Sequence, residues 1–203
     1  YDIQEAFVRY LKGEIPLSCY LDLLDFQENI YPQNYDKLRF LENHDVPRIA
    51  SHVKSESDLR NHTAMLYFNK GTTLVYAGQE AACSHLPSLF DRDTVDWNTG
   101  VDLSDLMRRM AKIKHEELDA DDALFVAADD ENDIAVLRRE HDGRRKVGVF
   151  SLKSRSAEVE VPLPDGTYEN LVDGSSITVR DGKLACAGTP IVLAVDVERA
   201  WGV

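Results

Sequence analysis

The chain contains no apolar run near the roughly 18 to 20 residues that a membrane-spanning helix needs. It has no secretory signal and begins at Tyr1 without a methionine, so we expect the true N-terminus to be absent. Cysteine is scarce, because Cys19, Cys83 and Cys186 are widely spaced and form no C-x-x-C pair. An odd number of cysteines without a motif predicts reduced thiols and a cytoplasmic location, and it predicts no metal site built on them.

Positive charge is also in short supply. Lys and Arg together number 23 against 36 Asp and Glu, which gives a net charge of −13. Such a surface repels nucleic acid and anionic membranes, so we expect neither as a partner; it suits a neutral ligand, or serves solubility alone. A length of 203 residues with 43% hydrophobic residues and no internal repeat fits one or two globular domains.

Residues 1–119 alternate helix-like and strand-like patterns. Apolar residues recur at helical spacing, Gly13 can close the first helix, and Tyr31-Pro32 ends the second. β-branched and aromatic residues that follow Gly71 predict a second, buried strand. Asp102 is expected to cap the last helix. The predicted helices cover residues 3–11, 16–30, 55–70 and 102–113, and the predicted strands cover residues 37–41 and 72–76.

Residues 120–203 have a different pattern. Short β-rich runs alternate there with turn pairs such as Asp142-Gly143 and Asp181-Gly182. Evenly spaced short strands with such turns predict an antiparallel β-sandwich. The acidic stretch that begins at Asp119 is the expected boundary, so we predict two domains, 1–119 and 120–203. The predicted strands cover residues 123–128, 133–140, 145–152, 157–163, 167–172, 176–180, 183–187 and 190–197.

Side chains that could carry chemistry follow both strands of the first half. His44 and Asp45 come directly after the first strand, and Tyr76 ends the second. Parallel barrel strands present reacting groups at their carboxyl ends, and a carboxylate beside an imidazole suits the vicinal hydroxyls of a sugar. The alternative is that Asn43 and Asp45 only form a turn. Arg48 could hold Asp45 ionised through a charge pair, or be an ordinary loop arginine.

Four segments resemble a known family. Phe40-Leu-Glu-Asn-His-Asp45 is similar to the fourth sequence region of the α-amylase family, glycoside hydrolase family thirteen. The segment 71–80 resembles that family's last conserved region, which usually reads G-x-P-x-x-Y-x-G-x-E, and Thr73 departs from it at the proline. The segments 89–91 and 95–97 resemble the stretch before the final barrel helix. All four stand in the family's order and at its spacing.

The resemblance implies a fold of α/β plus all-β class: the C-terminal portion of a (β/α)8 TIM barrel, with strands seven and eight, followed by an antiparallel β-sandwich domain. Asp45 would be the catalytic carboxylate that stabilises an oxocarbenium-like transition state, and His44 would contact the same sugar. We expect Asn43, Arg48 and Tyr76 to bind the substrate as well. Family members are retaining enzymes whose nucleophile and acid/base lie on earlier strands, so we expect the chain alone to be inactive.

The expected partner is an α-glucan or oligosaccharide, and we expect no cofactor in this chain, with calcium a candidate only for a longer parent. Transglycosylases and sucrose-acting enzymes share the motifs, and some proteins of this fold are non-catalytic interaction subunits. A carbohydrate-binding module in residues 120–203 is a further alternative. Two isolated parallel strands would expose their edges, so we expect the chain to self-associate, or residues 1–40 to pack differently from those of the parent.

Overall fold

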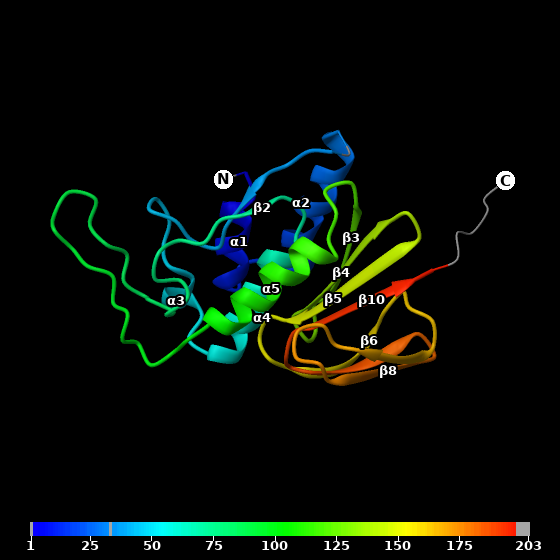
Figure 1. Cartoon of the computed structure of the whole chain (residues 1–203). Helices are drawn as coiled ribbons and strands as arrows, with labels where there is room; N and C mark the ends of the chain where they lie inside the picture. Colours follow the sequence, from blue (N-terminus) through cyan, green and yellow to red (C-terminus); the bar gives the residue numbers. More distant parts are fainter. Residues whose placement is uncertain (1, 33, 198–203) are drawn as a thin grey trace.

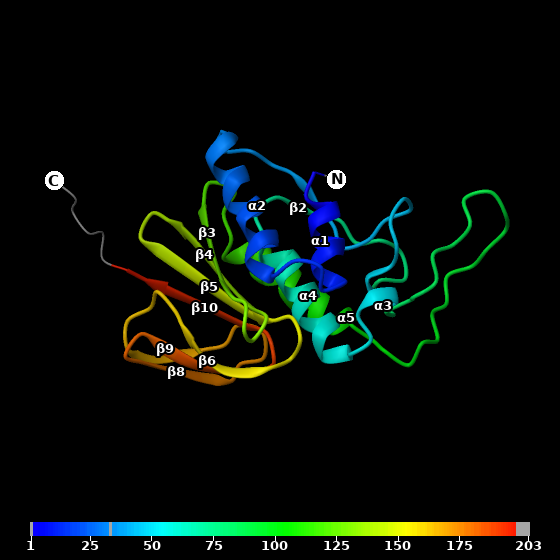
Figure 2. The same ribbon diagram turned by 180° about the vertical axis from the view of Figure 1, so that it is seen from behind.

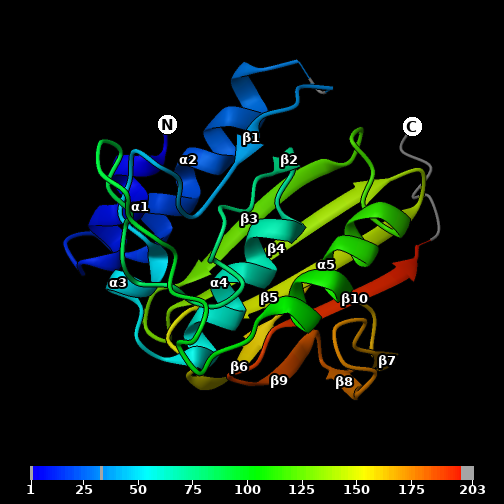
Figure 3. The same cartoon turned by 60° about the vertical axis from the view of Figure 1, so that its left-hand side comes forward.

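Helices cover one face of a four-stranded sheet, and a second four-stranded sheet covers its other face (Figures 1 and 3). The structure is a computed structural model that describes residues 2–32 and 34–197. The helices are α1 (Gln4–Leu11), α2 (Leu17–Ile30), α3 (Ile49–His52), α4 (Glu56–Phe68) and α5 (Ser104–Glu116). The strands are β1 (Leu38–Arg39), β2 (Thr72–Thr73), β3 (Ala123–Asp129), β4 (Ile134–His141), β5 (Arg144–Ser151), β6 (Ser156–Glu160), β7 (Gly166–Glu169), β8 (Ser176–Arg180), β9 (Lys183–Ala187) and β10 (Ile191–Asp196).

Strands β1 and β2 form a parallel pair joined through α3 and α4. Leu38 lies opposite Thr72 and Arg39 opposite Thr73, which is the β-helix-β order expected of a barrel. The prediction of a buried strand over residues 72–76 is wrong in this chain, because Thr72 is exposed and Thr73 is only partly buried. Among the described residues β2 pairs with β1 alone, so water reaches the side where a closed barrel would place another strand.

The second half forms two antiparallel sheets, with strand orders β10-β5-β4-β3 and β6-β9-β8-β7. Each of the eight strands overlaps a range that the sequence predicts. The turns explain this agreement: Asp142 and Gly143 both have positive φ, as do Asp181 and Gly182. Two consecutive positive φ angles form the tight hairpin turn whose twist matches the flanking strands.

Strand β4 shows how the layers share apolar residues. Ala135 and Leu137 face the helices, whereas Ile134 and Val136 face the second sheet. Successive side chains of a strand point to opposite faces, so a strand covered on both sides reads as a continuous apolar run. Helix α4 lies on this sheet in Figure 3 and is buried along almost its whole length, as Phe68 illustrates by packing on Phe150. One hydrophobic core therefore runs from the helices into the sheet.

Hydrogen bonds of polar side chains also connect the helices to the sheets. Asn61 of α4 is completely buried; its amide donates to Gly188 O at 2.8 Å, and its Oδ1 accepts from Ser151 N at 3.0 Å. The N-terminus of α2 is satisfied from the β3–β4 turn, because Asp130 accepts from Ser18 N at 2.8 Å and from Ser18 Oγ at 2.6 Å. A carboxylate at this end of a helix also complements the helix dipole. The division at residue 119 stays a prediction.

Helix α5 begins one residue later than expected. Leu103, not Asp102, occupies the N-cap position, although the Asp102 carboxylate still accepts from Ser104 N at 2.8 Å. None of the described helices is long and apolar enough to span a membrane. The three cysteines are free thiols, of which Cys19 is exposed and Cys83 and Cys186 are buried.

Candidate active site

Two loops leave the carboxyl ends of β1 and β2 on the same side of the molecule. The first contains residues 40–48 and the second begins at residue 74, and both run to the left in Figure 1 and to the right in Figure 2. Because β1 and β2 are parallel, side chains that follow them meet at one edge. This edge holds all five residues for which the sequence predicts a catalytic or binding role.

His44 and Asp45 are the accessible members of the site. Their side chains are 57% and 50% exposed, and His44 Nε2 lies 3.4 Å from Asp45 Oδ2. A ligand at this edge can therefore reach a carboxylate and an imidazole at once. Such a pair can accept from and donate to neighbouring hydroxyl groups.

Asn43 shapes the turn that presents Asp45. Its side chain is buried, and Oδ1 accepts from Asp45 N at 2.8 Å and from Val46 N at 3.2 Å. An Asn that accepts from backbone N–H groups further along the chain stabilises a turn. Asn43 therefore stabilises a turn, as the alternative interpretation of the sequence proposed, and this turn presents the exposed Asp45.

A buried ion pair underlies the turn. Arg48 and Glu42 are both completely buried, with Arg48 Nη1 donating to Glu42 Oε1 at 2.6 Å. The other Glu42 oxygen accepts from Ile49 N at 2.8 Å. Burial raises the pKa of Glu42, against the opposing effect of these two hydrogen bonds. Neither alternative considered for Arg48 describes it: its ion pair is made with Glu42 rather than with Asp45, and its side chain is buried, unlike that of an ordinary loop arginine. Glu42 is a residue that sequence reasoning missed.

Arg48 also connects the two loops. Its guanidinium carbon lies 4.3 Å from the centre of the Tyr76 ring, and its Nε donates to His85 O at 3.2 Å. Its Nη2 is buried and has no hydrogen-bond partner among the residues that the structure describes. Tyr76 is therefore held against a cation on one side. Arg48 acts here as a support for both loops, since its side chain is not exposed.

The second loop turns sharply at Gly78. This residue has φ of +92°, and an added Cβ would collide with Val95 Cγ1. Gly78 N donates to Glu80 Oε2 at 2.9 Å, and Tyr76 N donates to Gln79 Oε1 at 3.3 Å. These contacts lie within the loop, so they set the position of Tyr76 and assign no chemistry to Gln79 or Glu80.

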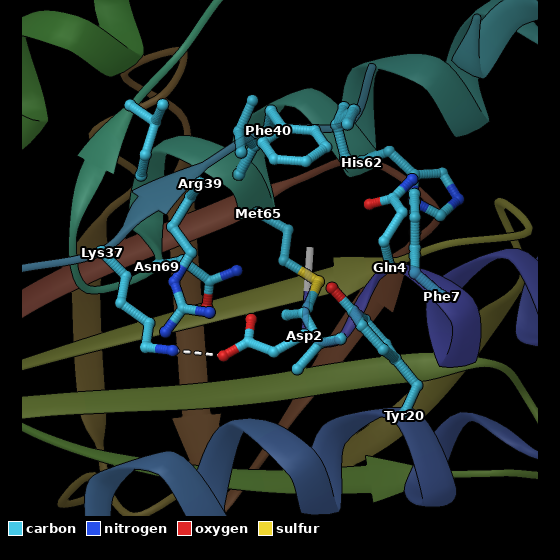
Figure 4. A pocket seen from close by; sticks show the side chains of 14 residues that line it. Asp2, Gln4, Phe7, Tyr20, Lys37, Arg39, Phe40, His62, Met65 and Asn69 are labelled. Carbon is cyan, nitrogen blue, oxygen red and sulfur yellow. Dashed lines mark hydrogen bonds and ion pairs between the residues drawn. The ribbon is translucent and has the colours of Figure 1, made fainter. Parts of the chain in front are cut away.

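A separate hollow lies between α1, β1 and α4 (Figure 4). Its volume is about 40 Å³, little more than space for a few water molecules, and a sugar ring does not fit. Lys37 at its rim pairs with Asp2. His62 in its wall is fully buried, and burial lowers its pKa to about 4, so the ring is neutral at pH 7. These features belong to packing rather than to the site.

The described residues contain no cluster of carboxylates for calcium. Across residues 2–32 and 34–197, no group of three or more His, Cys, Asp or Glu gathers in a way that could hold a metal ion. Calcium prefers six to eight oxygen ligands. No step of the chemistry is therefore assigned to a metal in this chain.

Comparison with known proteins gives two family matches and several relatives. Residues 15–125 match the alpha amylase catalytic domain, and residues 125–193 match the bacterial alpha amylase C-terminal domain. "Alpha-amylase 2" of Dictyoglomus thermophilum is 23% identical over 199 residues, covering 87% of this chain and 33% of that protein. An α-amylase structure from Lactobacillus plantarum is 33% identical with a TM-score of 0.85, covering 96% of this chain and 46% of that one. A maltogenic α-amylase from Thermotoga neapolitana is 22% identical with a TM-score of 0.81, covering 98% and 50%.

The chain thus spans about a third of the curated relative and about half of these two solved structures. The expected fold class is confirmed: the chain has the last part of an α-amylase barrel followed by the antiparallel sheets. Both loops of the site lie within the region that matches the alpha amylase catalytic domain, and neither lies within the region that matches the C-terminal domain. The chain belongs to the α-amylase family of glycoside hydrolases.

Proposed function

We propose that the chain supplies the sugar-binding part of the active site of a retaining α-glycosidase. The complete enzyme would act on α-glucosidic bonds of oligosaccharides or starch. Asp45 binds hydroxyls of the sugar at the cleaved bond and stabilises the positive charge that develops on it. His44 contacts the same sugar. The observation that carries this proposal is the half-exposed His44–Asp45 pair, presented at the carboxyl end of β1 above the buried Glu42–Arg48 pair.

The names of relatives support an α-glucan as substrate. Several structural neighbours are described as α-amylases, and that of Geobacillus thermoleovorans, 17% identical with a TM-score of 0.71, is complexed with acarbose. The strong negative charge of this chain also favours a neutral ligand over an anionic one.

Bond cleavage needs more than Asp45. A retaining glycosidase uses two carboxyl groups roughly 5 Å apart, one as nucleophile and one as acid/base. Glu42, the nearest acid in sequence, is buried and occupied by Arg48 and Ile49. By the family resemblance, both reacting acids lie on strands that precede this chain in the barrel. The chain alone therefore binds sugar without hydrolysing it.

The test has two parts. The purified chain is incubated with starch and maltooligosaccharides, and reducing ends are measured; no turnover is expected. Acarbose binding is then measured by calorimetry for the unaltered chain and for Asp45→Asn. Loss of one charge-assisted hydrogen bond should weaken binding by about 10- to 100-fold. Turnover that Asp45→Ala abolishes would contradict the inactivity, and equal affinity of the two proteins would contradict the role of Asp45.

A transglycosylase or sucrose-acting parent, and a non-catalytic interaction subunit, are the alternatives. The neighbours of the fold include a γ-cyclodextrin glucanotransferase from Bacillus clarkii, at 17% identity and a TM-score of 0.75, which informs on fold alone. Product analysis of the longer parent on maltooligosaccharides separates hydrolysis from transfer. An upstream coding sequence without an Asp and a Glu at two preceding strand ends would favour the interaction subunit.

Self-association is a related proposal. Leu38 of β1 and Val75 after β2 are 56% and 40% exposed, and both strands have open edges among the described residues. Open strand edges with apolar side chains promote pairing between copies. Light scattering over a concentration series should therefore show dimers or larger species. A monomer at every concentration would contradict this proposal.

A further inference from the structure

A cavity of about 430 Å³ opens where β1 and β2 begin, at the end of the strand pair opposite to Asp45. Four separate segments of the chain line it, and Tyr35, Thr73, Lys114 and Arg139 represent them. Small-molecule sites commonly have volumes of about 300–1,000 Å³. The cavity is therefore large enough for a ligand, and it belongs to neither loop of the candidate active site.

The lining of this cavity carries positive charge. Lys70, Lys114 and Arg139 contribute to it, and Asp36 is the acid among the described lining residues. One oxygen of Asp36 accepts a hydrogen bond from Thr72 Oγ1 at 2.8 Å. Because the whole chain has a net charge of −13, the sign of this lining is opposite to that of the chain. A concave surface with one sign of charge attracts ligands of the opposite sign.

Two of the three cations are balanced by acids of the chain itself. Lys70 and Arg139 are 1% and 2% exposed. Lys70 Nζ lies 3.4 Å from Glu28 Oε2, and Arg139 Nε lies 3.2 Å from Asp122 Oδ2. Both of these cations therefore have a counter-charge behind the wall of the cavity, and Lys114 is the member of the lining that differs.

Lys114 of α5 has two carbonyl partners and no ion pair with a described residue. Its Nζ donates to Tyr67 O at 2.9 Å and to Asn69 O at 2.8 Å, at the end of α4. An ammonium group has three N–H donors, so one remains for a further acceptor. Burial and the charge of Arg139 lower the pKa of Lys114 to about 7, and Asp36 opposes this shift only in part. The charge of Lys114 is therefore poorly compensated by the chain.

A second unused donor lies in the same cavity. Thr73 Oγ1 is buried and has no hydrogen-bond partner among the residues that the structure describes. A buried hydroxyl without a partner costs about 1–3 kcal/mol. A water molecule could accept from Thr73, but it would not balance the charge of Lys114. An anion with several oxygen atoms would do both.

We propose that this cavity binds a phosphate group, either as inorganic phosphate or as part of a small phosphorylated sugar, with Lys114 and Thr73 as donors. Hydrogen bonds from a cation to an oxyanion are stronger than those between neutral groups. A tetrahedral phosphate presents acceptors in several directions, so it can contact α5 and β2 at once. The site does not depend on the proposed function, because Asp45 lies beyond the other end of β1.

Titrations at pH 7 with inorganic phosphate, glucose 6-phosphate and glucose test this, with ionic strength held constant by sodium chloride. In proton–nitrogen NMR spectra, both phosphate compounds should shift the backbone amide signals of Gly71 and Thr73 and leave that of Asp45 in place. Glucose should not shift the signals of Gly71 and Thr73. Tighter binding of glucose 6-phosphate than of phosphate would identify a phosphorylated sugar as the ligand, and the reverse would identify the free ion.

Variants measure the contribution of each donor by calorimetry. Lys114→Met removes a charge-assisted hydrogen bond and should weaken phosphate binding by about 10- to 100-fold. Thr73→Val removes a neutral hydrogen bond at nearly constant volume and should weaken it by about two- to tenfold. Lys112→Met is the matched control on α5, because Lys112 is 71% exposed and pairs with Glu116. Its phosphate affinity should equal that of the unaltered chain.

Three results would overturn the proposal. The first is that neither phosphate compound shifts the signals of Gly71 and Thr73. The second is equal phosphate affinity of Lys114→Met and the unaltered chain, and the third is an equal loss of affinity in Lys112→Met, which would indicate attraction to surface charge alone. If circular dichroism shows that Lys114→Met does not fold, Thr73→Val decides, and an unchanged affinity of that variant would overturn the proposal.

Discussion

The buried pair beneath the Asp45 turn leads to a quantitative prediction. Arg48→Met removes the guanidinium that lies 2.6 Å from the Glu42 carboxylate and leaves that acid with one hydrogen bond, from Ile49 N. Both side chains of the pair are completely buried. Removing one partner of such a pair leaves the other charge buried without a counter-ion, which lowers the free energy of unfolding by about 3–5 kcal/mol. For a chain of this size, we expect the melting temperature to fall by about 6–20 °C.

Urea unfolding followed by circular dichroism gives the free energy of unfolding at a series of pH values. In Arg48→Met, the buried Glu42 can relieve its cost by taking up a proton, so its folded-state pKa lies further above the unfolded value. A raised carboxyl pKa favours folding below the unfolded pKa, and this stabilisation is lost as pH rises through the folded pKa. The deficit of the variant should therefore be smaller near pH 5 than near pH 8.

Two further proteins make the prediction refutable. Replacing both partners, as Glu42→Leu with Arg48→Met, removes the unpaired buried charge and should recover most of the lost stability. Arg108→Met is the control, because Arg108 pairs with Asp105 on the surface and its side chain is 74% exposed. Its loss should cost about 0–1 kcal/mol. If Arg48→Met is no less stable than Arg108→Met, or the double variant no more stable than Arg48→Met, the reasoning fails.

Three other changes test particular contacts. Gly78→Ala and Gly100→Ala both place a side chain at a positive φ, of +92° and +85°, but only at Gly78 does the added Cβ collide with Val95, whereas nothing lies within 4 Å at Gly100. Gly78→Ala should therefore destabilise the chain by about 1–3 kcal/mol more than Gly100→Ala, a difference that chemical denaturation measures. Asn43→Ala removes the acceptor of two turn N–H groups and should cost about 1–3 kcal/mol, with weaker acarbose binding, whereas Asn43→Asp keeps the acceptor and should lie close to the unaltered chain. Burial lowers the pKa of Lys114 from 10.5 to about 7, so between these pH values the unfolded chain binds more protons and the free energy of unfolding should rise with pH. Lys114→Met should flatten this rise in urea titrations, and an unchanged slope would contradict the prediction.

The strands of the second half could be predicted because their signals are local. Turn pairs such as Asp142-Gly143 occupy backbone angles that few residues tolerate, and they divide the sequence into short β-rich runs. The first half was harder. The strand predicted over residues 72–76 contains only Thr72 and Thr73, because a barrel strand needs a neighbour on each side and the part of the chain that the structure describes supplies one.

The exposed part of the site could also be predicted, and its support could not. His44 and Asp45 are adjacent polar residues after a strand, which is visible in the sequence. The partner of Arg48 depends on which way Glu42 points, and an acid after two apolar residues gives little hint that it is buried. Opposite charges six residues apart across a tight turn are the one signal that could have indicated the pair. Buried cations such as Lys146 were missed for a related reason, since Asp122, its partner, lies 24 positions away.

The packing of α4 on the first sheet bears on attempts to build chimeric amylases. A graft that exchanges only the C-terminal region would place new strands under Phe68. It would also remove the Gly188 carbonyl that accepts from Asn61 and the Asp130 carboxylate that accepts from the first turn of α2. If the chain were divided near residue 119, each piece would expose the apolar side chains that now pack between the helices and the first sheet. The crossover point that preserves these joints therefore lies upstream of α2 rather than between α5 and β3, and the terminal sheets should be inherited together with the helices that rest on them.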